Sequence, residues 1–258
     1  MPKFAANLTM MFNEVDFLDR FEAAAKCGFK GVEFLFPYAW DKDVLAEKLE
    51  KNGFQQALFN LPPGDWDAGD RGMAAIPGRE AEFKDTVGLA LEYAKALKCP
   101  TVHAMSGCAP EGVSLDAMSE TLVSNLQYAA DVYGAEGIDL IIEPLNSRNV
   151  PGYFLAYQGD AVKVIELCDK PNLGLQLDLY HVQIMEGDLA VHLKEFAGVT
   201  KHIQIAGVPE RHEPDVGEVN YPYLFSLMDE LGYAGWVGCE YTPKGKTEDG
   251  LGWFEAYK

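Results

Sequence analysis

The chain has 258 residues, 48% of them hydrophobic, and its 21 basic and 40 acidic side chains give a formal net charge of −19. This length matches one (β/α)8 barrel, and the composition is ordinary for a globular protein with a sizeable core. The acidic balance argues against nucleic acid as a partner, because affinity that rests on phosphate contacts needs a positive face.

The sequence shows no targeting or membrane signal. The N-terminal segment lacks a basic start and meets the polar residues Asn7 and Thr9 early, and the longest apolar runs have only the length of a strand. The five cysteines are scattered and include no CxxC pair, which favours buried free thiols. We therefore expect a cytoplasmic protein without a membrane partner, and the sequence leaves a homo-oligomer open.

Short β-rich runs alternate with amphipathic helical stretches along the chain, as in βα units around a parallel sheet. Two of the helices are predicted to end at Gly28 and Gly232. No GxGxxG follows the first run, so a dinucleotide-binding fold has no support. We predict an α/β fold, a single (β/α)8 TIM barrel domain over residues 1–258. Its strands are expected at 4–8, 31–36, 55–60, 101–105, 138–143, 173–178, 202–206 and 236–240.

The longest irregular stretch covers residues 61–78 and follows the third predicted strand. It contains turns that carry Trp66 and Arg71. A loop of this length in a compact domain is usually functional or disordered. We expect a lid over the active site, and a packed structural loop is the alternative.

Each predicted strand carries a polar residue at or near its C-terminal end, where barrel enzymes hold their active sites. One such residue is more often a cap or a loop anchor than a catalyst. The last four strands, however, contribute three carboxylates and an amide, whose joint burial without a counter-charge would be costly. A divalent cation held by oxygen ligands, Mg2+ or Mn2+, resolves this, and solvated strand ends are the alternative. The eight residues are Asn7, Glu33, Asn60, His103, Glu143, Asp178, Gln204 and Glu240.

Two residues beside these strand ends are candidates for substrate contact. His181 follows Asp178 by three residues and can point into the same mouth, although a lone histidine is more often structural. Arg211 lies in the loop after the seventh strand, and its planar fork suits a carboxylate. An exposed, salt-bridged loop is the alternative for Arg211.

Several segments of the sequence match one known family over essentially the whole chain. They are RFEAAAKCGF from Arg20, GVEFLFP from Gly31, PPGDW from Pro62, IPGRE from Ile76 and GWVGCEY from Gly235. With these segments the chain resembles the hydroxypyruvate isomerase family within the xylose isomerase-like barrels. The resemblance implies that Glu143 and Glu240 form the acid/base pair and that His181 and Arg211 lie near the substrate. It also implies a metal held by Glu143, Asp178, Gln204 and Glu240.

The substrate-facing loops point to two related sugar acids. The loop from Gln204 looks closer to 2-oxo-tetronate isomerases, and the segment from Gly64 looks closer to hydroxypyruvate isomerases. We expect a hydroxypyruvate isomerase that forms tartronate semialdehyde by metal-assisted enediolate proton transfer. The alternative is a 2-oxo-tetronate isomerase acting on a four-carbon sugar acid. Either substrate is a small anion, so a protein of this charge needs a local positive centre, from the metal with Arg211 or with Arg71.

Two other functions compete with an isomerase. An endonuclease IV-like phosphodiesterase shares this barrel superfamily, but it would need a histidine-rich zinc cluster, and the chain has five histidines in all. A non-catalytic sugar-acid-binding protein would be expected to have lost a proton-transfer carboxylate, yet Glu143 and Glu240 are both present. Fold alone does not separate these functions.

Overall fold

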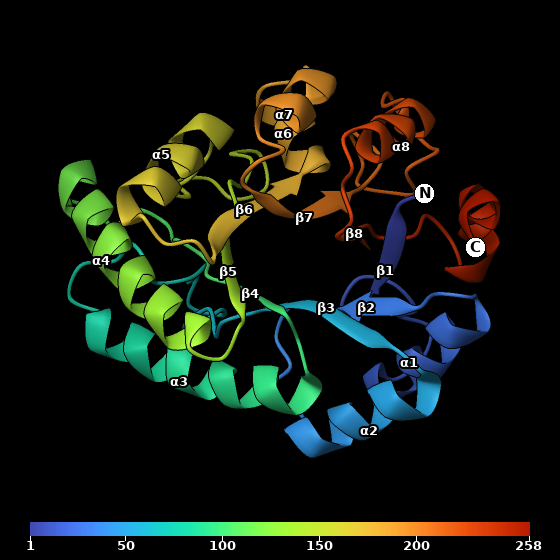
Figure 1. The fold of residues 1–258 in the computed structure, drawn as a ribbon, viewed down its shortest axis with the longest axis horizontal. Coiled ribbons are helices and arrows are strands. Elements are labelled where there is room, and N and C mark those ends of the chain that lie inside the picture. The colour runs from blue at the N-terminus through green and yellow to red at the C-terminus, as the bar shows by residue number, and fades with distance from the viewer.

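The computed structural model describes all 258 residues and contains a closed barrel of eight parallel strands surrounded by helices (Figure 1). Each strand pairs with the next in the chain, and β8 closes the barrel on β1. This confirms the predicted TIM barrel. The strands are β1 (Lys3–Asn7), β2 (Gly31–Glu33), β3 (Gln55–Asn60), β4 (Thr101–His103), β5 (Asp139–Ile142), β6 (Leu173–Asp178), β7 (Thr200–Ile205) and β8 (Trp236–Cys239).

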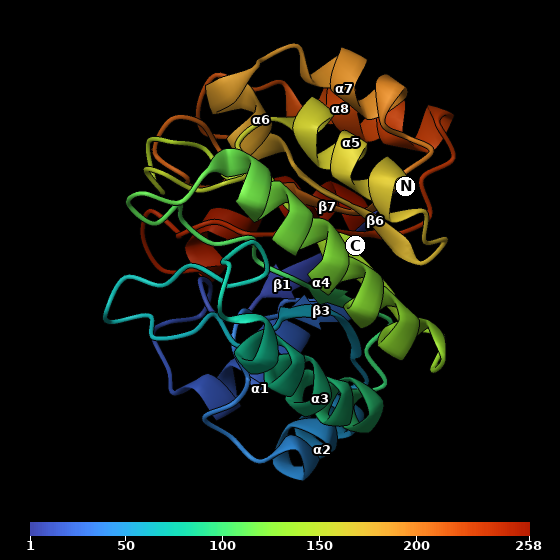
Figure 2. The ribbon, with the colours of Figure 1, turned by 90° about the vertical axis from the view of Figure 1, so that its left-hand side faces the viewer.

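The helices cover the outside of the barrel, and the loops that follow the strands gather at one end, on the left in Figure 2. We call this end the mouth. No helix is long and apolar enough to cross a membrane. The helices are α1 (Phe17–Lys26), α2 (Lys42–Asn52), α3 (Glu80–Leu97), α4 (Leu115–Gly134), α5 (Gln158–Cys168), α6 (Leu179–Met185), α7 (Leu189–Glu195), α8 (Tyr221–Glu230) and the 3-10 helix η1 (Glu248–Tyr257).

Several strands end earlier than the hydrophobic pattern predicts. β2 stops at Glu33, and its register with β3 shifts between Val32 and Glu33. β4 stops at His103, and the carbonyl group of Met105 accepts a hydrogen bond from the backbone of Ala74 in the 61–78 loop instead. The helix ends are as predicted, since Gly28 and Gly232 both have positive φ, 97° and 73°.

The barrel interior below the mouth is polar around Glu33. This carboxylate is buried and accepts hydrogen bonds from the Asn7 and Gln204 side chains at 3.0 and 2.8 Å. It also pairs with His202 Nε2 at 2.7 Å. β8 leaves room for it, because a Cβ atom at Gly238 would lie 2.3 Å from Glu33 Oε2. The interior thus places a hydrogen-bonded carboxylate directly beside the strand that carries Gln204.

Candidate active site

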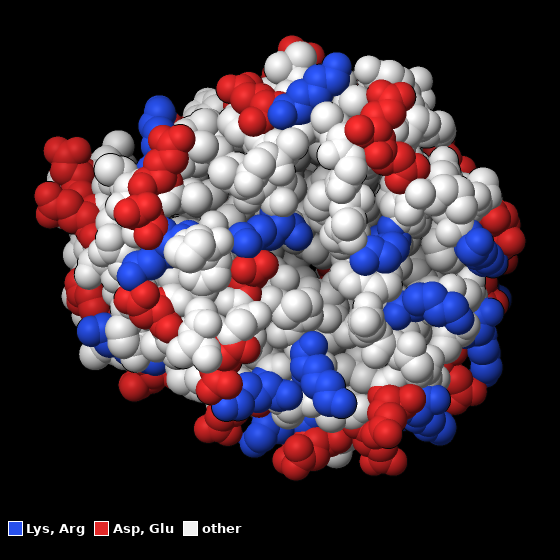
Figure 3. Space-filling model, viewed as in Figure 1, with Lys and Arg blue, Asp and Glu red and all other residues white.

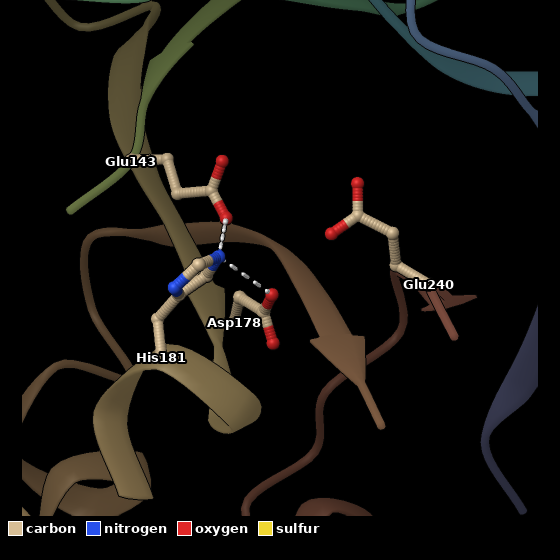
Figure 4. A group of neighbouring side chains, drawn as sticks. All are labelled: Glu143, Asp178, His181 and Glu240. Atoms are coloured by element: carbon tan, nitrogen blue, oxygen red, sulfur yellow. Dashed lines mark ion pairs between the residues drawn. The ribbon is translucent and has the colours of Figure 1, made fainter. Parts of the chain in front are cut away.

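Four side chains with possible ligand atoms within 4.8 Å of one another meet at the mouth (Figure 4). Glu143 follows the last residue of β5, and Glu240 follows the last residue of β8. Asp178 ends β6 and caps α6 by accepting a hydrogen bond from the backbone of Tyr180 at 2.8 Å, and His181 lies in the first turn of that helix. All four are buried.

A cavity of about 350 Å³ opens over this cluster. Its walls come from the loops after several strands, so residues far apart in the sequence share it. Trp66 and Arg71 of the 61–78 loop lie on its wall, and closure of this loop as a lid stays a prediction. The lining residues used below are Trp66, Arg71, Glu143, His181, Arg211 and Glu240.

The buried acids at the mouth hold their protons more tightly than free carboxyl groups do. Burial raises the pKa of Glu143 well above its usual value, and the charges of Glu240 and Asp178 raise it further. Burial also raises the pKa of Asp178. It raises the pKa of Glu240 to about 8, although the nearby Arg211 opposes this rise. Groups with pKa values moved toward neutrality are suited to exchange protons with a substrate.

Arg211 is directed into the cluster rather than toward solvent. Its Nη2 atom pairs with a carboxylate oxygen of Glu240 and lies 3.4 Å from Asp178 Oδ2. Its Nε atom donates to the carbonyl group of Glu240 at 3.2 Å, and its guanidinium lies 4.7 Å from the centre of the Tyr180 ring. The alternative of an exposed, salt-bridged loop is therefore wrong for this residue.

His181 is held in one tautomer by its neighbour. The backbone N–H of Asn146 donates to His181 Nδ1 at 2.9 Å, so Nδ1 carries no proton. Burial, with a contribution from Arg211, lowers the pKa of His181 well below its usual value and keeps the ring neutral. The proton therefore lies on Nε2, which is 3.4 Å from Asp178 Oδ2 and 3.9 Å from Glu143 Oε1. In this state His181 is a hydrogen-bond donor in the mouth rather than a metal ligand.

The carboxylates fit a divalent cation. Glu143, Asp178 and Glu240 bring three acidic groups together, and Arg211 supplies the single guanidinium paired with them. The buried Oε1 atom of Glu143 has no hydrogen-bond partner, as expected of an oxygen directed at an ion. Hard oxygen donors of this kind suit Mg2+ or Mn2+.

Gln204 lies level with Asp178, its register partner across β6 and β7. Its amide nitrogen donates to Glu33, and its amide oxygen accepts a hydrogen bond from Gln176. These bonds fix the orientation of the amide, and its role as a metal ligand stays a prediction.

Sequence reasoning left His103 without a role, although it placed this residue at a strand end. Its ring is buried, lines the cavity, and has Nδ1 3.2 Å from Asn60 Oδ1 and 3.8 Å from Glu143 Oε2. Burial lowers the pKa of His103 to about 3, so it is neutral. The sequence shows that His103 lies at a strand end, and this was the signal that could have found it. Its distance to Glu143 could not be predicted, because that distance is set only when the strands close into the barrel.

The fold and the buried acidic cluster define a TIM-barrel enzyme with a candidate divalent metal site. The family model of the xylose isomerase-like TIM barrel matches residues 21–257. A 2-oxo-tetronate isomerase from Cupriavidus necator is 54% identical, over 100% of this chain and 99% of its own. A hydroxypyruvate isomerase from Escherichia coli K12 is 48% identical over the full length of both. The chain belongs to this xylose isomerase-like family and is an isomerase of its 2-oxo-tetronate and hydroxypyruvate isomerase group.

A crystal structure from Brucella melitensis has the same fold throughout. It is described as an AP endonuclease of family 2, is 58% identical and covers both chains completely with a TM-score of 0.99. The backbone of this chain is thus nearly the same as that of a protein with a different functional description. The choice between functions has to come from the side chains of the site.

Proposed function

We propose that the protein is a 2-oxo-tetronate isomerase, with its 258 residues acting as one catalytic domain. The substrate is then a four-carbon acid with a carbonyl group at C2 and a hydroxyl group at C3. Hydroxypyruvate, the three-carbon acid that the sequence led us to expect first, has the same reacting unit. The four-carbon alternative is favoured because the 2-oxo-tetronate isomerase from Cupriavidus necator is 54% identical and the hydroxypyruvate isomerase 48% identical.

The reaction moves a carbonyl group between neighbouring carbons by proton transfer. One of the two glutamates, Glu143 or Glu240, removes the proton from C3 to give a 2,3-enediol. The other returns a proton to C2, and the hydroxyl proton passes from O3 to O2. The product is the 2-hydroxy-3-oxo acid, and no oxidant or reductant is needed.

Other side chains at the mouth supply the charge stabilisation and the hydrogen bonding that the reaction needs. Glu143, Asp178 and Glu240, with Gln204 as the predicted fourth ligand, would hold Mg2+ or Mn2+, and a cation held there would stabilise negative charge on the substrate oxygens. His181 can donate from Nε2 to a substrate oxygen. Arg211 offsets the charge of Glu240 and Asp178 beside the reacting carbons.

The observation that carries this proposal is the placement of Glu143 and Glu240. Both are buried, both line the same cavity, and they face each other across the group drawn in Figure 4. A substrate between them would have a carboxyl group on each side of the two carbons that exchange protons. Proton transfer by positioned groups contributes roughly 10²–10⁴-fold in rate.

A substrate comparison tests the proposal. The protein should be assayed with 2-oxo-tetronate and with hydroxypyruvate, each with added Mg2+, with Mn2+ and with a chelator. We expect the higher kcat/KM with the four-carbon acid and loss of activity with the chelator. A higher kcat/KM with hydroxypyruvate would restore the three-carbon assignment. Binding of both acids without turnover would instead favour a binding protein.

The endonuclease description of the Brucella protein has less support in this site. The histidines lining the cavity are His103 and His181, both neutral and beside carboxylates, and the chain carries a charge of −19. At the end of the barrel opposite the mouth, basic side chains are interspersed with acidic ones (Figure 3). Cleavage of DNA containing an abasic site, together with no turnover of either sugar acid, would contradict the isomerase assignment.

A further inference from the structure

The cavity over the cluster has only two cationic side chains on its wall, Arg71 and Arg211. Its two histidines already face groups of the protein, since His181 Nδ1 accepts from the backbone of Asn146 and Nε2 lies 3.4 Å from Asp178, while His103 Nδ1 lies 3.2 Å from Asn60 Oδ1. A substrate carboxylate that is bound by a side chain of this cavity therefore meets one of the two arginines. The two arginines differ in whether their N–H donors are already bound to groups of the protein.

Arg211 is already paired. Its Nη2 atom contacts Glu240 and Asp178, and its Nε atom donates to the carbonyl group of Glu240. A substrate carboxylate at this guanidinium would compete with two buried carboxylates that belong to the protein. Losing such a partner would leave a buried charge uncompensated, which is strongly unfavourable.

Arg71 has a free edge. Its side-chain hydrogen bonds both run from Nη1, to the carbonyl oxygens of Trp66 at 3.1 Å and Asp70 at 2.7 Å. The neighbouring carboxylate of Asp70 does not neutralise it, because that group is paired with Arg79 at 2.8 Å. The Nε and Nη2 atoms remain as a two-donor edge, the arrangement that binds a carboxylate through both oxygens.

The loop holds this guanidinium in place. It stacks on the Trp66 ring at 3.7 Å, and that ring packs on Phe36 with centroids 5.3 Å apart. The next residue, Gly72, has φ 99° and approaches the segment after β4 so closely that a Cβ atom would lie 2.3 Å from Met105. The base of the Arg71 side chain is thus anchored, and a preorganised arginine loses little entropy when it binds.

From these contacts we infer that Arg71, stacked on Trp66, is the receptor for the carboxylate of the sugar acid and selects acids over neutral sugars. Arg211 then serves as the internal counter-ion of Glu240 and Asp178. The inference deepens the proposed function and rests on it only in requiring a ligand with a carboxylate. It also gives the 61–78 loop a role in specificity that does not depend on closure.

Binding of a matched pair of ligands tests the inference without turnover. Erythronate is a four-carbon hydroxy acid that has no carbonyl group to isomerise, and erythritol is its uncharged counterpart. Both would be titrated calorimetrically, with Mg2+ present, into the parent, Arg71→Ala, Arg71→Lys and Arg148→Ala. Arg148 is exposed and outside the cavity wall, so its variant controls for the loss of one positive charge.

We expect Arg71→Ala to weaken erythronate binding by roughly 10- to 150-fold, the range for losing a hydrogen bond to a charged group. Arg71→Lys should lose less, while erythritol binding and the Arg148→Ala variant should match the parent. Parent-like binding of erythronate to Arg71→Ala, equal losses for both ligands, or no erythronate binding by the parent would overturn the inference. If Arg71 governs erythronate binding but 2-oxo-tetronate is not turned over, only the proposed function fails.

Discussion

The ability of Glu143 and Glu240 to exchange protons depends on their burial as much as on their position at the mouth. A carboxylate on the surface would titrate near its ordinary value, whereas burial raises the pKa of Glu240 to about 8. Arg211 limits this rise in pKa because its guanidinium pairs with the Glu240 carboxylate. The chemistry of each residue at the mouth therefore depends on neighbours that come from other strands.

The Glu240→Gln variant tests the acid/base assignment. The amide keeps the size of the side chain but cannot transfer a proton, so we expect kcat to fall by roughly 10²–10⁴-fold. At pH 7 a carboxyl group with a pKa of about 8 is already largely protonated, and Asp178 still pairs with Arg211 in this variant, so we expect the free energy of unfolding to change little. Steady-state kinetics and urea denaturation measure the two quantities. A variant with most of the parent rate would remove Glu240 from proton transfer.

Individual residues also mark the limit of sequence reasoning at the site. The strand-end pattern located Glu143, Asp178 and Glu240, which the structure brings together. It did not reveal that Arg211 pairs with two of them, since that pairing depends on the path of the loop after β7. Nor did it separate Arg71 from Arg211, because only the contacts show which guanidinium is already neutralised.

At the scale of whole elements, β3 and β6 have the bounds predicted from hydrophobic patterning. The patterning overestimated β2, because a shift of register after Val32 cannot be seen in apolar spacing. It also placed Glu143 and Glu240 inside strands, whereas each follows its strand by one residue. Strand existence follows from local composition, but strand ends depend on pairing with neighbours.

The strands β2, β7 and β8 together build the support beneath the mouth. Glu33 on β2 accepts from Gln204 and pairs with His202, both on β7, and Gly238 on β8 leaves space for it. Gln204 is the register partner of Asp178, so this support adjoins the predicted metal ligands. We infer that Glu33 positions Gln204.

Replacing Glu33 tests that support. The Glu33→Ala variant leaves the side chains of Asn7, Gln204 and His202 without their buried acceptor, and each unsatisfied donor costs about 1–3 kcal/mol. We expect the free energy of unfolding to fall by about 3 kcal/mol or more, and Mg2+ affinity to fall as well. Glu33→Gln keeps an acceptor and should lose less. Equal stability of the alanine variant and the parent in urea denaturation would show that the network is not needed.

The whole molecule should respond to the metal. A ligand that binds only the native state stabilises it by about 2.7 kcal/mol at 100 times its Kd. Mg2+ or Mn2+ should therefore raise the Tm of the parent. Asp178→Ala should lose this response, since it removes one of the three buried carboxylates of the cluster. An unchanged parent Tm with and without a chelator, with no metal found by elemental analysis, would count against the site.

The metal response should also depend on pH. Ligands must be deprotonated to bind a cation, and burial raises the pKa of Glu240 to about 8. Affinity should consequently rise between pH 6 and pH 8 as Glu240 loses its proton, and the Tm gain at fixed Mg2+ should rise with it. The Glu240→Gln variant is the control, because it removes the contribution of this group while the raised pKa values of Glu143 and Asp178 remain, so the pH dependence should become smaller.

We propose that the isomerase moves a proton between C2 and C3 through two separate carboxyl groups. An aldose-ketose isomerisation can instead pass hydride directly between the carbons, and the two routes differ in the origin of the hydrogen at C2. Turnover of 2-oxo-tetronate in D2O, followed by NMR of the product, measures this directly. We predict deuterium at C2, because the glutamate that delivers the proton exchanges with solvent. Product that retains substrate protium at C2 throughout would contradict proton transfer through the glutamates.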